Sequence, residues 1–406
     1  MGKKRVAVIF GGRSVEHDVS ILTGLQCLDA LDTTLYDGFP IYVDPLGQMW
    51  TGPALRKRSL YPVEAAASQG LTSVQLDLAS AASGGPRFLV SKKGFLGTKQ
   101  DALPFDIMIP AIHGSNGEDG TLQGLLEFAG IPYTGCRPLG AAATMDKAFT
   151  KRTARAAGLS VLPELVVDRP EKGAFIDDAW LRTALSDAMP TCDGPWIVKP
   201  VNLGSSVGVS KADDADGLMA ALLAVFRMDG QAIIEPFVPN LVEYNVAVRG
   251  TPSGDTVTSA IERPVRGADL LNFTEKYMSG SKAGAPKVDA PSEGMASLNR
   301  VINPDELTNK QDRLIRETAT RVFDMLDLAG SVRIDFLCDG KTGELWFNEA
   351  NTVPGSFAWF LWQDAPEPVG FLELTSAMIE EGFKRSSTRL GRTDSSVGGS
   401  TIFKAG

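Results

Sequence analysis

Ionic side chains interrupt two apolar runs near the C-terminal end of the chain, in the stretch RIDFLCDGKTGELWFNEAN at residues 333–351. The two runs flank DGKTG, a turn-like sequence, and therefore predict a β-hairpin. Arg333, Asp335, Glu349 and Asn351 stand where a buried strand would carry valine or leucine. Charges inside a sheet are costly unless they are paired or bind a ligand. These four side chains are therefore candidate site residues.

The register of this hairpin decides whether the four side chains can act together. Residues two apart on a strand share a face, so Arg333 accompanies Asp335, and Glu349 accompanies Asn351. We expect an odd-numbered turn centred on Lys341, which places Arg333 opposite Glu349 with Asp335 diagonal to it on the same face. An even-numbered turn would put the two halves on opposite faces. Three oxygen ligands on one face suit Mg²⁺, and an Arg–Glu pair with an exposed Asp is the structural alternative.

A glycine-containing loop follows another predicted strand in WIVKPVNLGSSVGVSK, residues 196–211. Its backbone N–H groups could bind phosphates, and Lys199 could neutralise them. It is not a Walker A loop, because no GK[ST] opens a helix. A flexible hairpin loop is the alternative.

Two further loops follow predicted strands of the N-terminal part. GGRSVEHDVS, residues 11–20, carries Glu16 but lacks the G-x-G-x-x-G pattern of dinucleotide dehydrogenases. IHGSNGEDG, residues 112–120, carries His113. Both lie at the carboxyl ends of strands, where α/β proteins bind ligands. A helix-capping Glu16 and a structural His113 are the alternatives.

The elements that must position these residues alternate between strand and helix. RVAVIF at 5–10 and FDIMIPAI at 105–112 are typical of buried parallel strands, and TLQGLLEFAG at 121–130 of a helix ended by glycine. The pattern predicts an α/β chain with four segments. They are an open α/β domain over 1–138 with an insertion at about 46–103, a second unit over 139–237, a third over 238–385, and a mobile tail over 386–406.

Composition excludes several classes of protein. The chain has 406 residues, a formal net charge of -9 and a pI near 5.0, which argues against nucleic-acid and membrane-surface binders. Its four cysteines are widely spaced, which predicts neither a zinc site nor a disulfide framework. Four isolated cysteines fit a reducing compartment. No apolar run reaches membrane-spanning length, and the N-terminal one is too short for a signal peptide. A cytoplasmic enzyme is expected.

Taken together and in this order, the motifs resemble those of the D-alanine–D-alanine ligases, which belong to the ATP-grasp group. The similar segments are GGRSVEHDVS, HGSNGEDGTLQG, KPVNLGSSVGVSK, EKY and RIDF…NEANTVPG, within about residues 5–380. The resemblance implies a three-domain ATP-grasp architecture, in which an open parallel α/β domain precedes two α+β domains that sandwich ATP. It also implies small-molecule substrates and a homodimer.

The resemblance further implies a reaction and its cofactors. ATP would phosphorylate the carboxylate of one D-alanine, and the amine of a second would attack the acyl phosphate, giving D-alanyl-D-alanine for peptidoglycan. Two Mg²⁺ ions, for which Mn²⁺ could substitute, would bridge the ATP phosphates. Their ligands would be Asp335, Glu349 and Asn351.

Site residues follow from the same resemblance. Arg333 and the backbone N–H of Gly355 would stabilise the oxyanion formed by amine attack. Glu16, Ser205 and Tyr277 would form a hydrogen-bonded trio that holds a loop closed. The predicted substrate-binding residues are Glu16, His113, Lys276 and Ser356. The predicted ATP-binding residues are Lys147, Lys199, Ser206, Glu235, Phe237, Val238, Glu243 and Lys276.

One segment departs from the family pattern. Phe360, in NTVPGSFAWFLWQD, stands where a serine that contacts the acceptor's carboxylate is expected. Either the aromatic residues pack in the core, or they rebuild the acceptor pocket for another amino acid or an amine. An ATP-binding protein without ligase activity is a lower alternative, and a nicotinamide dehydrogenase is lower still.

Overall fold

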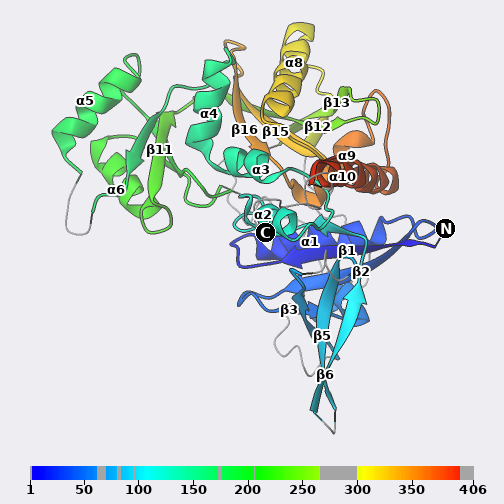
Figure 1. The fold of residues 1–406 in the computed structure, drawn as a ribbon. Helices are drawn as coiled ribbons and strands as arrows, with labels where there is room; N and C mark the ends of the chain where they lie inside the picture. The colour runs from blue at the N-terminus through cyan, green and yellow to red at the C-terminus, as the bar shows by residue number, and fades with distance from the viewer. Residues whose placement is uncertain are drawn as a thin grey trace, which may run out of the picture.

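Three β-sheets form the frame of the chain in the computed structural model, which describes residues 2–61, 70–79, 84–94, 97–171, 176–204, 206–265 and 300–393. The sheets follow one another along the sequence, with β1–β7 in the first, β8–β11 in the second and β12–β16 in the third. In Figure 1 the first sheet, blue to cyan, lies below the other two. The α/β class predicted from the sequence is confirmed, whereas the predicted domain boundaries stay predictions.

The first sheet has the strand order β6-β5-β4-β3-β2-β1-β7. Its parallel part consists of β2 (Tyr36–Val43), β1 (Lys4–Gly11) and β7 (Ile107–Pro110). Antiparallel strands extend it through the predicted insertion: β3 (Met49–Thr51), β4 (Thr72–Leu76), β5 (Arg87–Gly94) and β6 (Gly97–Pro104). Two short 3-10 helices, η1 (Pro53–Arg56) and η2 (Arg58–Leu60), connect β3 with β4.

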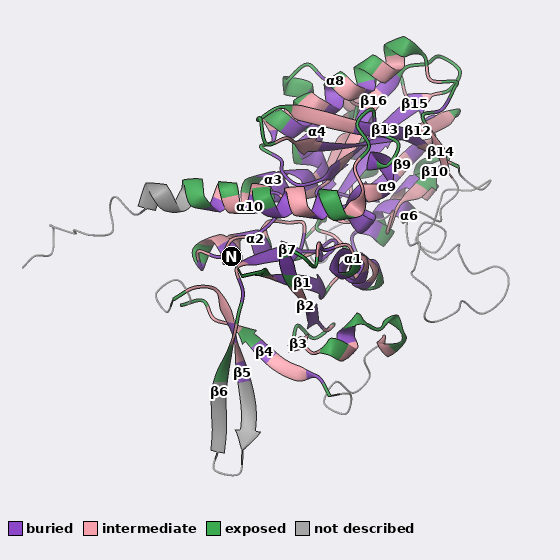
Figure 2. Cartoon of the chain, turned by 90° about the vertical axis from the view of Figure 1, so that its right-hand side faces the viewer, coloured by how far each residue is buried: buried purple, intermediate pink, exposed green. Residues whose placement is uncertain are grey.

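Both faces of the parallel part are covered. Alternate residues of β1 enter two cores, Val8 on the side of α1 (His17–Asp29) and Ile9 on the side of α2 (Thr121–Phe128). Figure 2 shows this burial as purple strands. Because helices cover both faces of the sheet, a ligand can bind only at the carboxyl ends of the strands. The loops after β1 and β7, which carry Glu16 and His113, lie there.

The second sheet is antiparallel, in the order β10-β9-β11-β8. Its strands are β10 (Ser210–Ala212), β9 (Trp196–Pro200), β11 (Gln231–Pro236) and β8 (Leu165–Asp168). One face packs against α5 (Asp178–Ala188) and α6 (Ala215–Val225). Residues of the other face, which include Lys199 and Glu235, alternate with those core residues.

The third sheet has the order β14-β13-β12-β15-β16. Its strands are β14 (Arg300–Ile302), β13 (Thr256–Pro264), β12 (Leu241–Gly250), β15 (Val332–Asp339) and β16 (Leu345–Asn351). Helix α8 (Asn309–Met325), which begins with a Thr308–Gln311 capping box, packs against one face through an apolar core. The opposite face carries the polar residues.

Short helices join the three sheets. Helices α3 (Pro138–Met145) and α4 (Lys147–Ala156) follow the first sheet, and α4 lies between the second and third sheets (Figure 1). The Asp146 side chain caps α4, which fixes Lys147 as its first residue. Near the C-terminus, α9 (Trp359–Trp362) packs in the first core with residues of α10 (Phe371–Thr393). Helix α10 contains residues 386–393, which were predicted as tail, and 394–406 lie outside the described residues.

The hairpin of β15 and β16 corrects the predicted register. Cys338 pairs with Leu345 and Asp339 hydrogen-bonds Glu344, so the turn has an even number of residues, not the odd number expected. Such a turn alone would separate Asp335 and Glu349 onto opposite faces. A bulge between Asp335 and Phe336 inserts Asn348 into β16 and restores the shared face. Asp335 therefore lies opposite Glu349, and Arg333 opposite Asn351 instead of Glu349.

Candidate active site

A row of polar residues crosses four strands of the third sheet. Glu262 of β13 lies opposite Asn245 of β12, Asn245 opposite Asp335 of β15, and Asp335 opposite Glu349 of β16. Directly opposite residues share a face, so the four side chains form one line on the face away from α8. Arg333 lies two residues from Asp335 on the same face. The structure thus brings the predicted hairpin residues together.

Asp335 is the most contacted carboxylate of this row. It is 8% exposed and accepts two parallel bonds from Arg333, each of 2.7 Å. The Asn351 side-chain N–H also donates to it, at 3.0 Å, which turns the amide oxygen of Asn351 away from Asp335. A bidentate guanidinium–carboxylate pair is geometrically specific. Arg333 is therefore held in a defined orientation on the same face as Asp335.

Lysines of the second unit approach the same hairpin. Lys147 Nζ lies 3.9 Å from Glu349 Oε2 and donates to the Leu203 carbonyl at 2.5 Å. Lys199 Nζ donates to Asn348 Oδ1 at 3.3 Å. Because of the bulge, the consecutive residues Asn348 and Glu349 contact Lys199 and Lys147 respectively.

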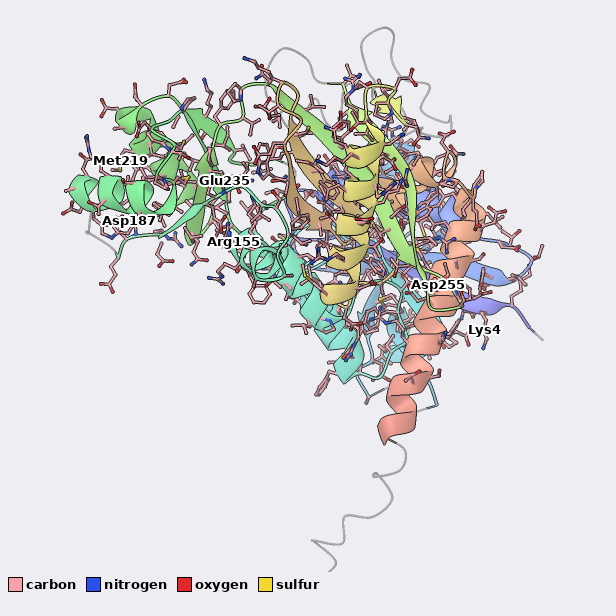
Figure 3. All side chains as sticks on the ribbon, turned by 90° about the horizontal axis from the view of Figure 1, so that it is seen from above. Lys4, Arg155, Asp187, Met219, Glu235 and Asp255 are labelled. Atoms are coloured by element: carbon pink, nitrogen blue, oxygen red, sulfur yellow. The ribbon has the colours of Figure 1, made fainter. Side chains whose placement is uncertain are left out.

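A third lysine, which the sequence analysis did not single out, completes this cluster. Lys151 of α4 is fully buried and forms an ion pair with Glu235, whose other oxygen lies 2.7 Å from Lys199 Nζ. Figure 3 labels Glu235, on the side of its sheet that faces the third sheet. Both Glu235 oxygens are engaged by lysines, so the carboxylate positions these ammonium groups.

The pKa shifts in this cluster reflect burial opposed by charge. Burial alone would raise the pKa of Glu235, but Lys151 and Lys199 outweigh it and lower that pKa to about 2. Burial lowers the pKa of Lys147, Glu349 opposes the shift, and Lys199 adds to it. Concentrated buried ammonium groups are stabilised by a bound anion, and a phosphate chain is the anion that this arrangement suits.

A small cluster of buried apolar side chains includes residues of the strands that carry the polar row. Val238, Leu162 and Leu337 form a buried cluster, and Leu337 lies two residues beyond Asp335 on the same face. Phe237 stacks under Lys211, and Glu243 is on β12. Ser206 adopts a left-handed conformation with φ of 60° in the glycine-containing loop. The ATP-binding roles of Phe237, Val238, Glu243 and Ser206 stay predictions.

Glu16 approaches the glycine-containing loop from the first sheet, and His113 lies in the loop after β7. Glu16 is 4% exposed and stands at the start of α1 without making a side-chain cap bond, against the capping alternative. A Cβ atom added at Gly204 would lie 3.0 Å from Glu16 Oε2, so the loop approaches this carboxylate closely. His113 is buried and bonds Thr23 Oγ1 through Nε2 at 2.8 Å. Burial, assisted by Arg333, lowers the pKa of His113 to about 3, so its ring is neutral.

Glu118 is a site residue that the sequence analysis missed. It accepts from the Gly114 N–H at 2.8 Å and from the Val353 N–H at 2.9 Å, and thereby joins the His113 loop to the segment after β16. Burial, and then the charge of Glu16, raise the pKa of Glu118 to about 8. Its place in a glycine-rich loop was the available signal, but nothing in the sequence indicated its burial.

The raised pKa of Glu118 predicts a pH-dependent stability. Because the folded protein binds a proton that the unfolded chain releases above about pH 4.5, stability should fall as pH rises from 5 to 8. Glu118→Gln should flatten this slope, since glutamine is neutral throughout. Urea unfolding at several pH values measures it. An identical slope in the variant would show that Glu118 is ionised in the folded protein.

The segment after β16 contains a strained turn. Ser356, Phe357 and Ala358, in η7 (Gly355–Ala358), have φ values of 52°, 53° and 53°, in the left-handed region that costs non-glycine residues energy. Thr23 accepts from the Ser356 N–H at 3.1 Å, Gln26 accepts from its hydroxyl, and Ser331 donates to the Phe357 carbonyl at 2.7 Å. These bonds hold the turn against α1 and fix Gly355 beside Arg333's strand. They also engage the Ser356 hydroxyl that was predicted to bind substrate.

The aromatic residues that follow pack in the core. Phe357, Phe360 and Trp362 are buried in the core shared with α1 and α10. Of the two alternatives left open by the sequence, the structure therefore has the packed one. The remaining predicted site residues, Ser205, Lys276 and Tyr277, lie outside the described residues.

The donor set fits magnesium. Among the described residues no three His, Cys, Asp or Glu side chains gather into a metal site. Asp335 and Glu349 supply hard carboxylate oxygen atoms on one face, and Asn351 lies on the same face with its amide N–H bonded to Asp335. Mg²⁺ is commonly bound by one or two carboxylates together with substrate phosphates and water, which is what this set allows.

The second sheet and helix α4 bring Lys147, Lys151 and Lys199 to the carboxylates on the facing antiparallel third sheet, which is the arrangement of an ATP-grasp ligase. The chain belongs to the D-alanine–D-alanine ligase family. Its residues 5–136 match the D-Ala–D-Ala ligase N-terminal model and residues 155–380 the C-terminal model. It is an ATP-dependent ligase.

Named relatives span nearly the whole chain. A D-alanine–D-alanine ligase of Ruminiclostridium cellulolyticum is 36% identical and covers 95% of this chain and 96% of its own length. D-alanine–D-alanine ligase A of Bradyrhizobium diazoefficiens is 33% identical and covers 95% and 97%.

Solved structures share the fold. The D-Ala:D-Ser ligase VanG of Enterococcus faecalis has a TM-score of 0.70 at 24% identity, and covers 94% of this chain and 100% of its own. The D-alanine–D-alanine ligase of Helicobacter pylori has a TM-score of 0.65 at 25% identity, and covers 92% and 98%. No helix among the described residues is both long and apolar enough to span a membrane.

Proposed function

We propose that this ligase activates the carboxylate of D-alanine with ATP and joins it to the amine of a second D-alanine. The observation that supports this most is the polar row on the third sheet facing the buried lysines of the second unit. The lysines could bind the phosphates of ATP, and the Arg333 guanidinium lies where the oxyanion would form. The proposed product is D-alanyl-D-alanine, which would serve peptidoglycan synthesis.

ATP lies between the second and third sheets in this proposal. Its base binds beside Phe237 and Val238, and Glu243 binds the ribose. Lys147 and Lys199 bind the α- and β-phosphates, with Lys199 held by Glu235. Bound Mg²⁺, held by Asp335, Glu349 and Asn351, would supply charge neutralisation and orient the phosphates.

The donor D-alanine lies where the first sheet meets the other two. Glu16 binds its ammonium group, and neutral His113 hydrogen-bonds its carboxylate without adding charge. Transfer of the γ-phosphoryl group to that carboxylate gives an acyl phosphate. Burial of the site protects this intermediate from water.

Amide formation then uses Arg333 and Gly355. The acceptor amine attacks the acyl carbon, and negative charge grows on the carbonyl oxygen. The Arg333 guanidinium and the Gly355 N–H bind this oxyanion, and phosphate leaves. Ser205, Lys276 and Tyr277 keep their predicted roles in loop closure and substrate binding. The homodimer, the second Mg²⁺ ion and the cytoplasmic location also stay predictions.

The direct test incubates purified protein with ATP, Mg²⁺ and D-alanine alone and follows ADP release and product mass. Rapid ADP release with D-alanyl-D-alanine as the product supports the proposal. No turnover until another amino acid or an amine is added would overturn the choice of D-alanine as acceptor. ATP binding without any substrate-dependent turnover would overturn the ligase mechanism.

A further inference from the structure

Arg300 is a buried arginine on the catalytic face that the mechanism above does not use. It opens β14, the edge strand of the third sheet, and lies two residues before Ile302, which is paired with Glu262. Residues two apart share a face, so Arg300 lies on the same face as the polar row. Its side chain is 10% exposed. A buried guanidinium at this place calls for a functional explanation.

The contacts of Arg300 extend the polar row to the sheet edge. Its Nη1 donates to Glu262 Oε2 at 2.8 Å, and Asn245 donates to the other Glu262 oxygen at 2.9 Å. The chain of contacts therefore runs from Arg300 through Glu262 to the neighbour of Asp335. Each member is held by the next, so the guanidinium has a defined position.

The ring of Phe360 stacks against this guanidinium. The Arg300 Cζ atom lies 3.9 Å from the centre of the Phe360 ring, which is the geometry of a cation–π stack. Phe360 itself is buried in the core. The aromatic ring at the unusual position in the sequence thus orients a cation, and a planar guanidinium matches a carboxylate through paired N–H donors.

The spacing between Arg300 and Arg333 suits a small amino acid. Strands β14 and β15 are three strand steps apart, or about 15 Å between backbones, and Arg300 and Arg333 lie on the same face of the sheet across this distance. The charge of Arg333 contributes to lowering the pKa of Arg300, after burial, so the two cations interact. An α-amino acid carries its carboxylate on the carbon next to its amine. It can therefore present the amine on the Arg333 side and the carboxylate to Arg300.

We propose that Arg300, stacked on Phe360 and braced by Glu262, binds the carboxylate of the acceptor, which makes the acceptor an amino acid and excludes a simple amine. This inference rests on the proposed function, because it assigns the second substrate of the same reaction. Arg300 contributes binding and orientation, whereas Arg333 acts on the oxyanion.

The test lets two acceptors compete for the same activated donor. Hydroxylamine attacks an acyl phosphate without needing a carboxylate site, so the ratio of dipeptide to D-alanine hydroxamate reports acceptor binding independently of the donor step. Arg300→Gln should lower this ratio about 100-fold, since charge-assisted bonds to a carboxylate are lost, while hydroxamate formation stays within about threefold of wild type. The ratio of dipeptide to hydroxamate for Arg300→Lys should lie between those of wild type and Arg300→Gln. Lysine keeps the positive charge but lacks the paired N–H donors of the guanidinium.

Arg263→Gln is the matched control, because Arg263 lies on β13 beside the edge strand, belongs to the other face and pairs with Glu306. Its ratio should equal that of wild type. An unchanged ratio in Arg300→Gln, or an equal loss of both products, would overturn the inference and leave Arg300 a structural brace. Efficient use of D-alaninamide by wild type would also overturn it. Absence of both products with wild type would instead overturn the proposed function.

Discussion

Replacing Asp335 with asparagine should lower kcat by about 1,000-fold or more. Asp335 and Glu349 are the two carboxylates that the bulge brings onto one face. Losing one of them removes part of the proposed Mg²⁺ site, and the charge stabilisation that a bound metal supplies is worth several kcal/mol in the transition state. Steady-state ADP release, with D-alanine and ATP saturating, measures the loss.

Glu344→Gln provides the control for this substitution. Glu344 is an exposed carboxylate in the turn of the same hairpin, so the variant removes the same charge without touching the site. Its kcat should match that of wild type. Calorimetric titration of ATP should also show that Asp335→Asn needs more Mg²⁺ for binding. Wild-type activity in Asp335→Asn would remove the hairpin from the mechanism.

Glu235→Gln should destabilise the folded protein by about 3–5 kcal/mol at pH 7. The substitution leaves Lys151 and Lys199 buried side by side without the carboxylate that pairs with both. It should also weaken ATP binding, because Lys199 loses its support. Urea unfolding and nucleotide titration measure the two effects.

The pH dependence gives this prediction a second readout. The folded pKa of Glu235, about 2, lies below its ordinary value of 4.5, so its stabilisation is fully present above pH 4.5 and is lost as pH falls toward 2. The difference between wild type and Glu235→Gln should therefore shrink over that range. Asp178→Asn, which breaks the exposed Asp178–Arg182 pair, should cost less than about 1 kcal/mol. Equal effects of the two substitutions would contradict the buried-triad description.

The sequence was most informative where local pattern determines structure. Apolar runs located β1, β7 and β15, and the pattern TLQGLLEFAG located α2. The hairpin residues were found because charges in a buried strand are unusual. The resemblance of the motifs to those of the ligase family implied the ATP-grasp fold, and this fold class was confirmed.

The register of the hairpin could not be derived from local pattern. A bulge changes strand pairing by one residue, and nothing in the letters around Asn348 distinguishes a bulged residue from a paired one. The expected pairing of Arg333 with Glu349 was wrong for this reason. The shared face was nevertheless correct, because the even turn and the bulge compensate each other.

Residues brought together from distant segments were also beyond the sequence. Lys151 meets Glu235 across more than eighty positions, and Arg300 meets Phe360 across sixty. A lysine in an amphipathic helix and an arginine at a strand start are ordinary until their partners are known. Glu118 was missed because its effect depends on burial beside Glu16.

Oxygen transfer from D-alanine to phosphate tests the central claim most directly. Turnover of D-alanine labelled with ¹⁸O in its carboxylate should place one ¹⁸O atom in inorganic phosphate for each dipeptide formed. That result is required if the acyl phosphate forms on the polar row. Release of AMP and pyrophosphate, or dipeptide formation with unlabelled phosphate, would contradict the mechanism.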